Sequence, residues 1–590
     1  MDKFKDRGVP LSVAVIDMDW HLVSDDRVPH SGWTGYTWDD SLFPNPGQFG
    51  RELHSRNLKI TLNDHPHAGI HHHEDSYEEM AKAIGHDTKD KTPILFEPTS
   101  RKFMDAYLSI LHRNVEKLAC DFWWIDWQQG TYSKVPGVDP LWVLNHFHFL
   151  DNCREDARGI IFSRFGGPGS QRYPVGFSGD TVTTWDSLAF QPEFTATASN
   201  IGYGWWSHDI GGHMLGARDD ELVTRWVQFG VMSPLMRLHS TNSHWASKEP
   251  WCYRKESEEV MERYMQFRHR LIPYLYSMNV RAAKQDEPLI QPLYWHFPER
   301  AEAHEHKNEY CFGTELYVFP IVKPRDKRTN LACVGAWLPP NAGRLVDIIA
   351  GIVYDGDREL NLYRRLDNIP ILAKEGAIIP LDAAEAPKNG GVNPEAFEVL
   401  VVIGRDGQMS VLEDPADDDE EVKKKAPSSG ERGSLIQYRQ KEGALTANVT
   451  GRTWAFRFLA VTTPPEGLKV KVNDKDITKE VKVTTHEYPE TPSILVQCPF
   501  QAYEEKYTIT IELGADPQLS IIDHKARVRD YLLDYQTEFS IKDKLWSIVD
   551  DGGKGGVNVK MGKLMSLSVD ETLTEPIAEL ILSDSRGMHL

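Results

Sequence analysis

The first half of the chain alternates short apolar runs with longer segments of mixed polarity. Each run is about as long as a strand and ends in polar residues, whereas the segments between the runs have helical spacing of their apolar residues. Strands that are apolar on both faces and alternate with helices are typical of a parallel sheet covered by helices. The five clearest candidate strands are residues 11–20, 57–64, 121–127, 158–164 and 203–212.

Two fainter candidate strands, near 231–236 and 288–293, bring the count to seven strand–helix units. The helix expected over 100–119 shows the clearest helical spacing. A closed (β/α)8 barrel needs eight such units. We therefore predict a (β/α)8-type TIM barrel whose first strand is missing from this sequence.

After about residue 300, short strands separated by turn residues replace the alternating pattern, and this change is typical of β-sandwich domains. The clearest of these strands are 315–322, 396–404, 435–440 and 507–513. The predicted domains are a catalytic barrel over 1–300, a proximal β-sandwich over 301–385, a distal β-sandwich over 386–515 and a C-terminal extension over 516–590.

The formal net charge of −21 excludes partners that such a chain would repel, namely nucleic acids and anionic membranes. A neutral substrate remains compatible with this charge. The six cysteines are scattered without a CxxC pair, as in a protein that keeps its thiols reduced. The first ten residues are too polar for a signal peptide, and no apolar run approaches about 18 residues. We expect a cytoplasmic protein.

Polar residues that end barrel strands are the candidates for catalysis, because the carboxyl ends of the strands form the active face. These residues are Asp17, Asp19, Asp64, Asp126, Arg164, Asp209 and His239. Aspartate predominates, and glycoside hydrolysis needs two carboxyl groups, one ionised to attack and one protonated to assist the leaving oxygen. An aspartate after a strand can equally cap the next helix, so position alone does not select the pair.

Five motifs select it by resemblance. Trp124-Ile125-Asp126 matches the nucleophile signature of glycoside hydrolase family 31, and residues 163–180 (SRFGGPGSQRYPVGFSGD) resemble its second signature. Three shorter segments, 15–19, 208–212 and 236–239, resemble further family motifs. The resemblance extends in order from residue 11 to about residue 515.

The resemblance implies a retaining α-glycosidase in which Asp126 is the nucleophile and Asp180 the general acid/base. It also implies that Arg164 holds the sugar and the carboxylates, and that His239 faces a sugar hydroxyl. The full set of substrate-binding residues implied is Asp17, Met18, Trp124, Arg164, Phe177, Asp209 and His239. The implied partner is a small carbohydrate, and no cofactor or metal is implied.

One departure from the family pattern means that the sequence does not determine which sugar is bound. The family commonly continues the nucleophile signature as Asp-x-Asn-Glu, whereas this chain has Trp127, Gln128 and Gln129 after Asp126. Terminal α-linked glucose is the expected sugar. The alternatives are α-xylose or another α-sugar, transfer of glucose to an acceptor sugar, and a truncated, non-catalytic carbohydrate-binding relative.

A histidine-rich segment follows the second candidate strand. Asp64, His65 and His67, followed by His71–His73, offer zinc-ligand chemistry. The spacing does not match HExxH, and the segment has the character of a loop. We therefore expect no metal there.

Overall fold

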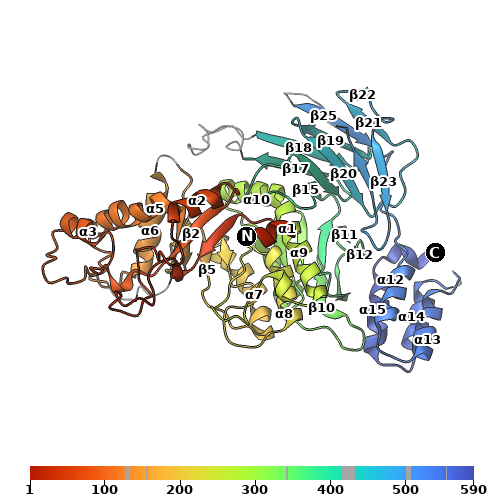
Figure 1. The fold of residues 1–590 in the computed structure, drawn as a ribbon. Helices are drawn as coiled ribbons and strands as arrows, with labels where there is room; N and C mark the ends of the chain where they lie inside the picture. Colours follow the sequence, from red (N-terminus) through yellow and green to blue (C-terminus); the bar gives the residue numbers. More distant parts are fainter. Residues whose placement is uncertain are drawn as a thin grey trace.

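The computed structural model describes residues 1–126, 130, 133–154, 157–340, 343–414, 432–499, 506–552 and 555–589 of the 590-residue chain. A parallel barrel sheet with its helices comes first, antiparallel sheets follow, and a group of helices ends the described chain (Figure 1). Among these residues, no helix combines the length and the apolar character needed to cross a membrane.

The barrel sheet contains six parallel strands in sequence order. They are β1 (Val13–Ile16), β2 (Lys59–Asp64), β3 (Phe122–Ile125), β4 (Phe162–Arg164), β5 (Gly176–Phe177) and β6 (Trp206–Ser207). A parallel bridge between Ile210 and Leu238 continues the curl beyond β6. β1 pairs only with β2 and so forms one edge of this curled sheet. The predicted TIM-barrel architecture is confirmed.

Three details of the predicted strand count are wrong. Strand β5 was missed, because two residues are too few to show a periodic pattern. Residues 231–236 were expected to form a strand, but Val231 is the last residue of helix α8 (Asp220–Val231). This helix is buried along most of its length. Residues 288–293 do contain a strand, β7 (Ile290–Pro292), but it pairs antiparallel with β8 (Tyr310–Phe312) outside the barrel.

Helices cover the outside of the barrel sheet, and several begin at a side-chain cap. Asn45, Asp139, Thr184 and Asp219 each accept a backbone hydrogen bond at the start of a helix. The α-helices that precede β8 are α1 (Asp2–Asp6), α2 (Pro46–His54), α3 (Tyr77–Ile84), α4 (Arg101–Ala106), α5 (Arg113–Ala119), α6 (Pro140–Asn152), α7 (Trp185–Ala198), α8, α9 (Lys255–Arg270), α10 (Ile272–Gln285) and α11 (Ala301–Glu305), of which α10 packs on β15 (Ile378–Asp382) and β17 (Gly407–Glu413) instead of the barrel sheet. A π-helical segment, η3 (Tyr107–His112), joins α4 to α5.

Antiparallel pairing begins with β7. One six-stranded sheet has the order β12-β11-β14-β9-β8-β7, and a two-stranded sheet pairs β10 with β13. The strands not yet bounded are β9 (Leu316–Val318), β10 (Ala332–Leu338), β11 (Arg344–Asp347), β12 (Val353–Asp355), β13 (Arg358–Arg364) and β14 (Ile371–Lys374).

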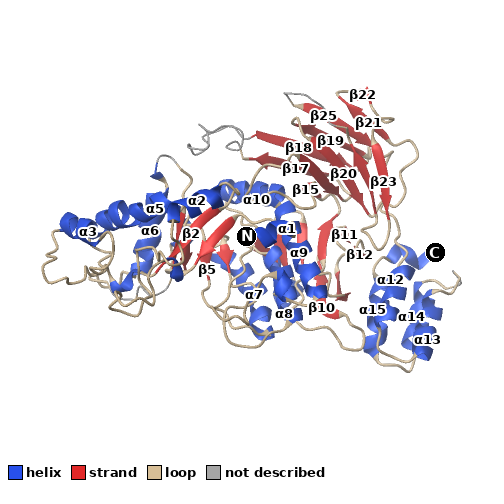
Figure 2. Cartoon of the chain, viewed as in Figure 1, coloured by secondary structure: helices blue, strands red, loops and turns tan. Residues whose placement is uncertain are grey.

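Two further sheets follow and form the strand-rich region at the top right of Figure 2. The first contains β15 (Ile378–Asp382), β16 (Ala396–Val401), β20 (Thr453–Leu459), β24 (Ser493–Gln497) and β23 (Lys482–His486). The second contains β17 (Gly407–Glu413), β18 (Arg432–Arg439), β19 (Ala444–Val449), β25 (Tyr507–Glu512), β21 (Lys469–Val472) and β22 (Lys475–Asp476). Burial alternates along β19 and β25, as expected when one face of each strand packs on a core.

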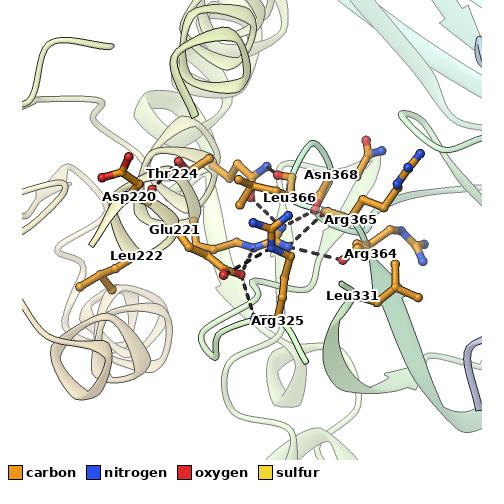
Figure 3. Close-up of polar contacts among 12 residues, drawn as sticks. Asp220, Glu221, Leu222, Thr224, Arg325, Leu331, Arg364, Arg365, Leu366 and Asn368 are labelled. Atoms are coloured by element: carbon orange, nitrogen blue, oxygen red, sulfur yellow. Dashed lines mark hydrogen bonds and ion pairs between the residues drawn. The ribbon is translucent and has the colours of Figure 1, made fainter. Parts of the chain in front are cut away.

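A buried arginine joins the barrel to the segment after β13. Arg225 on α8 is fully buried and donates to the carbonyl oxygens of Asn368 at 2.6 Å and Arg365 at 3.1 Å. Beside it, the backbone N–H of Arg325 donates to Glu221 of α8 (Figure 3). These hydrogen bonds give partners to polar groups on both sides of the junction.

Four α-helices and a short 3-10 helix, η11 (Ser585–His589), end the described chain. The α-helices are α12 (Lys525–Asp534), α13 (Phe539–Val549), α14 (Val557–Met565) and α15 (Glu571–Leu582). They share one hydrophobic core with strands β10 to β14. Within this contact, Arg364 is buried and donates to Glu579 of α15 at 2.9 Å and to Asp347 at 2.7 Å. The hydroxyl of Tyr354 donates to Glu579 at 2.5 Å.

Candidate active site

Two carboxylates at neighbouring strand ends share one guanidinium group. Asp126 follows β3, Arg164 ends β4, and Asp180 follows β5. Arg164 Nε donates to Asp126 Oδ1 at 2.6 Å, and Arg164 Nη2 donates to Asp180 Oδ1 at 3.2 Å. The two aspartates predicted as the catalytic pair therefore lie on the same face of the barrel, with the predicted Arg164 between them.

Asp126 is buried and held in its ionised form. Its second carboxylate oxygen accepts a hydrogen bond from Asn63 Nδ2 at 3.2 Å and lies 3.5 Å from His65 Nε2. Burial by itself would raise the pKa of Asp126. The contact with His65 and the positive charge of Arg164 outweigh burial and hold this pKa well below its usual range.

Asp180 has a more open environment than Asp126. Its side chain is 38% exposed, against 11% for the side chain of Asp126. Besides Arg164, its carboxylate faces His213 Nε2 at 3.9 Å. The pair therefore consists of one enclosed, ionised carboxylate and one carboxylate that solvent can reach.

Glycine at position 179 makes room for the shared arginine. Gly179 has a φ of +83°, and a Cβ atom built there would lie 2.0 Å from Arg164 Nη1. On its other side, the Arg164 guanidinium carbon lies 5.3 Å from the centre of the Phe177 ring. Residues of the second signature thus fix the arginine that contacts both carboxylates.

Asp17 also belongs to this face. It follows β1, caps the short 3-10 helix that starts at Met18, and accepts a hydrogen bond from the Met18 backbone N–H at 2.7 Å. The Asp17 carboxyl is open to solvent but surrounded by many protein atoms. This partial desolvation, together with the negative charge of Asp126, raises the pKa of Asp17.

Asp209 is buried beneath Asp180 and paired with an arginine. It accepts a hydrogen bond from Arg237 Nη2 at 2.6 Å and another from the backbone N–H of Thr181 at 3.1 Å. Burial raises the pKa of Asp209 above its usual range, although Arg237 opposes this effect. Asp209 thus fixes the backbone directly after Asp180.

His239 follows the bridge at Leu238 and packs among aromatic rings. Its ring lies 4.5 Å from the ring of His213, nearly parallel to it, and 5.4 Å from the ring of Trp124. Burial, with the positive charge of Arg237, lowers the pKa of His239 to about 2, so the ring is neutral at ordinary pH. A neutral imidazole is suited to hydrogen-bonding a hydroxyl group.

All nine predicted site residues lie at or next to the carboxyl ends of the barrel strands. Trp124 and Phe177 are apolar and, like Asp209, almost fully buried, at 1% and 2% exposed. Their rings lie 6.0 Å apart within a small aromatic core that also contains Phe162. In the structure described here, these two residues support the site from below.

Four further residues were not among the predicted set. Asn63 and His65 contact Asp126, His213 faces Asp180, and Arg237 pairs with Asp209. The sequence did carry signals for them, because Asn63 and His65 flank a strand end and Arg237 lies inside a motif that was recognised. Which of them would contact the carboxylates depended on backbone geometry that the sequence does not display.

Two groups of histidine and aspartate side chains among the described residues have ligand atoms within 4.8 Å of one another. One is Asp180, Asp209 and His213 at the site. Arginines already pair with both of its aspartates, so a cation there would meet two positive charges. The other is Asp64, His112 and His148, between the sheet and its helices. The departure noted at Trp127, Gln128 and Gln129 lies outside the described residues.

A carboxylate pair at the carboxyl ends of parallel barrel strands is an arrangement found in (β/α)-barrel glycoside hydrolases. Comparison with known protein families points to the same class of protein. The model of the glycosyl hydrolases family 31 TIM-barrel domain matches residues 1–278, and that of the family 31 C-terminal domain matches residues 286–379. The chain belongs to glycoside hydrolase family 31.

Its relatives in sequence are distant. An α-xylosidase of Saccharolobus solfataricus is 24% identical over 443 residues, which are 70% of this chain and 57% of the relative. Human neutral α-glucosidase C is 25% identical over 408 residues, 63% of this chain and 44% of the relative. The chain spans about half the length of the curated relatives it matches.

Solved structures show the same fold. A family 31 dextranase of Flavobacterium johnsoniae, complexed with glucose, superposes with a TM-score of 0.68 at 18% identity, covering 87% of this chain and 68% of the dextranase. A cycloalternan-forming enzyme of Listeria monocytogenes, in complex with a pentasaccharide substrate, gives the same TM-score and identity and covers 87% of this chain and 52% of that enzyme.

Proposed function

We propose that the chain is a retaining α-glycoside hydrolase that releases a terminal α-linked sugar, with Asp126 as nucleophile and Asp180 as general acid/base. The observation that carries the proposal is the Arg164 guanidinium, which contacts both carboxylates. A retaining mechanism requires carboxyl groups about 5–5.5 Å apart, and we predict this separation in the sugar-bound enzyme.

In the first step, Asp126 attacks the anomeric carbon while Asp180 gives its proton to the leaving oxygen. The low pKa of Asp126 keeps it ionised and ready to attack. Asn63, His65 and Arg164 hold its two oxygens, so the carboxylate is already oriented when the sugar arrives.

In the second step, Asp180 acts as a base. It takes a proton from water, and the water oxygen attacks the anomeric carbon and breaks its bond to Asp126. Asp180 suits both steps, because its side chain is open enough for a leaving group or a water molecule to reach it. Two inversions at one carbon give net retention.

Glucose is the proposed sugar. Relatives named as α-glucosidases and α-xylosidases both match this chain at about a quarter identity. Asp17 and His239 are proposed to bind hydroxyls of the terminal sugar, and Met18, Trp124, Phe177 and Asp209 to complete or support its binding site. Transfer to a second sugar instead of water is the alternative, since one structural neighbour is a cycloalternan-forming enzyme.

Azide distinguishes the two catalytic roles. In Asp126→Gly, azide enters the vacated space and attacks an activated α-glucosyl fluoride once, so the product is the β-glucosyl azide. In Asp180→Gly, fluoride leaves without needing a proton, and azide releases the intermediate as the α-glucosyl azide. With a poor leaving group, Asp180→Gly is expected to lose about 10²–10⁴ in rate.

The anomer is read by NMR of the isolated product. Near-normal hydrolysis of a poor leaving group by both variants would mean that neither aspartate is catalytic and that this assignment of the site is wrong. Asp186→Gly, at an acidic residue in the first turn of α7, is the control and is expected to behave like the wild type.

We also propose a cytoplasmic location and the four domain ranges predicted from the sequence (1–300, 301–385, 386–515 and 516–590). The location is supported by six cysteines that all remain unpaired, as in a reducing compartment. Fusion to a fluorescent protein and limited proteolysis test these two proposals separately.

A further inference from the structure

A buried cluster of side chains that are able to bind a metal lies behind the proposed nucleophile, Asp126. Asp64 ends β2, His112 ends the π-helical segment η3, and His148 lies on α6. The three residues are 3%, 0% and 2% exposed. Successive residues of a strand point to opposite faces, so Asn63 faces Asp126 whereas Asp64 faces the covering helices.

The donor atoms of the cluster converge. Asp64 Oδ2 lies 3.1 Å from His112 Nε2 and 3.9 Å from His148 Nε2, and all three ligand atoms lie within 4.8 Å of one another. Ligands around a tetrahedral Zn²⁺, with bonds of about 2.0–2.2 Å, are about 3.3–3.6 Å apart. The two distances from Asp64 Oδ2, 3.1 and 3.9 Å, lie close to that range.

The hydrogen bonds of His112 leave a place for a cation. His112 Nδ1 lies 2.9 Å from the carbonyl oxygen of Tyr107, which can only accept, so Nδ1 carries a proton. Its Nε2 atom lies 3.1 Å from Asp64 Oδ2. A metal ion bound by Nε2 and the carboxylate would therefore have its imidazole ligand oriented by the Tyr107 carbonyl, as is usual for metal-binding histidines.

His148 provides a second, independent observation. Its Nε2 atom is buried and has no hydrogen-bond partner, although it is directed at the same carboxylate oxygen. A buried polar atom without a partner is costly, and coordination would remove that cost. The carboxylate is also fixed by tyrosines, because Tyr107 Oη donates to Oδ2 at 2.7 Å and Tyr36 Oη to Oδ1 at 3.2 Å.

We propose that Asp64, His112 and His148 bind a structural divalent transition metal, for which Zn²⁺ matches the two imidazoles and one carboxylate best. The metal would join β2, η3 and α6 behind the active site and takes no part in the glycosidase steps. The sequence implied no metal for this chain, and the proposal departs from that expectation. Of the histidine-rich segment after β2, only Asp64 belongs to this cluster.

The test is the metal content of the full chain expressed with added Zn²⁺ and purified in chelator-treated buffer. We expect one Zn²⁺ per chain for the wild type and for His146→Leu. His146 lies on the same helix and instead contacts the Tyr173 hydroxyl at 2.6 Å. In His148→Leu, loss of a direct ligand is expected to weaken Zn²⁺ binding by more than the roughly 10–100-fold typical of outer-shell partners.

Thermal melting of His148→Leu distinguishes a site with a bound metal from one without, because the expected change in melting temperature differs between the two cases. Without a metal, replacing a buried, unpartnered imidazole with leucine is neutral or stabilising. With a metal, His148→Leu melts below the wild type, and a chelator lowers the melting temperature of the wild type and of His146→Leu but not that of His148→Leu.

Co²⁺ loading of the wild type needs no variant, and it should give the visible absorption of tetrahedral cobalt. A wild type that holds no Zn²⁺ and shows no Co²⁺ band overturns the proposal, as does equal metal content in wild type and His148→Leu. Azide chemistry at Asp126 and Asp180 is independent of either result.

Discussion

Arg164 couples the two proposed catalytic carboxylates through a single charge. Replacing it with methionine removes one of the groups that hold the pKa of Asp126 low. That pKa then rises, the ionised fraction of Asp126 falls at acidic pH, and the acid limb of kcat/KM moves to higher pH. Because a preorganised charged donor is also lost, kcat/KM at the optimum is expected to fall by on the order of 10²–10³.

The measurement is the pH profile of kcat/KM for Arg164→Met beside Arg172→Met. Arg172 is an exposed arginine of the same signature segment, and its replacement should leave the profile of the wild type. An acid limb that does not move in Arg164→Met would show that Arg164 does not control the ionisation of Asp126.

The loop from β4 to Asp180 depends on glycine in two different ways. Gly179 has a positive φ and no room for a Cβ, whereas Gly167 has a φ of +104° and nothing within 4 Å of a Cβ built there. Alanine at either position costs about 1–3 kcal/mol of backbone strain. Only Gly179→Ala also displaces Arg164, so it is expected to lose most activity, whereas Gly167→Ala keeps it.

Parallel denaturation and kinetic measurements on the two variants separate the effects. Similar losses of stability with very different losses of kcat are the expected outcome. Equal activity in Gly167→Ala and Gly179→Ala would mean that the position of Arg164 does not matter.

At the level of elements, apolar runs that end in polar residues predicted β1 to β4 and β6, although β1 is only partly buried at the edge of the sheet. β5 could not be found in this way, since Gly176 and Phe177 form a strand only through their neighbours on both sides. β7 had the right composition, but its antiparallel partner is set by the chain that follows. The family motifs predicted Asp126, Asp180 and Arg164 as site residues, whereas the positions of His65 and His213 beside the carboxylates depend on three-dimensional contacts.

At the scale of the whole molecule, the C-terminal helices are held by a buried charge cluster. Glu579→Ala removes the carboxylate that accepts hydrogen bonds from Arg364 Nη1, the Tyr354 hydroxyl and the Tyr363 backbone N–H. Leaving a buried charge with fewer partners costs about 3 kcal/mol, the lower part of the usual range, because Asp347 still pairs with Arg364.

Urea denaturation of Glu579→Ala and of Glu571→Ala measures this cost. Glu571 is exposed at the start of the same helix, so its replacement should change the unfolding midpoint little. Equal midpoints in the two variants would exclude an important contribution from the buried cluster.

The same contact has a consequence for how the protein is made. Glu579 is synthesised 215 residues after Arg364. At about 5–20 residues per second, a ribosome needs roughly 10–40 s to cover that distance. Throughout this interval Arg364 has only Asp347 as its carboxylate partner, and the apolar surface that α12–α15 will cover faces solvent. The nascent chain therefore exposes a hydrophobic sheet surface during synthesis. Chaperones that bind such surfaces are expected to bind it until the last helix has been synthesised.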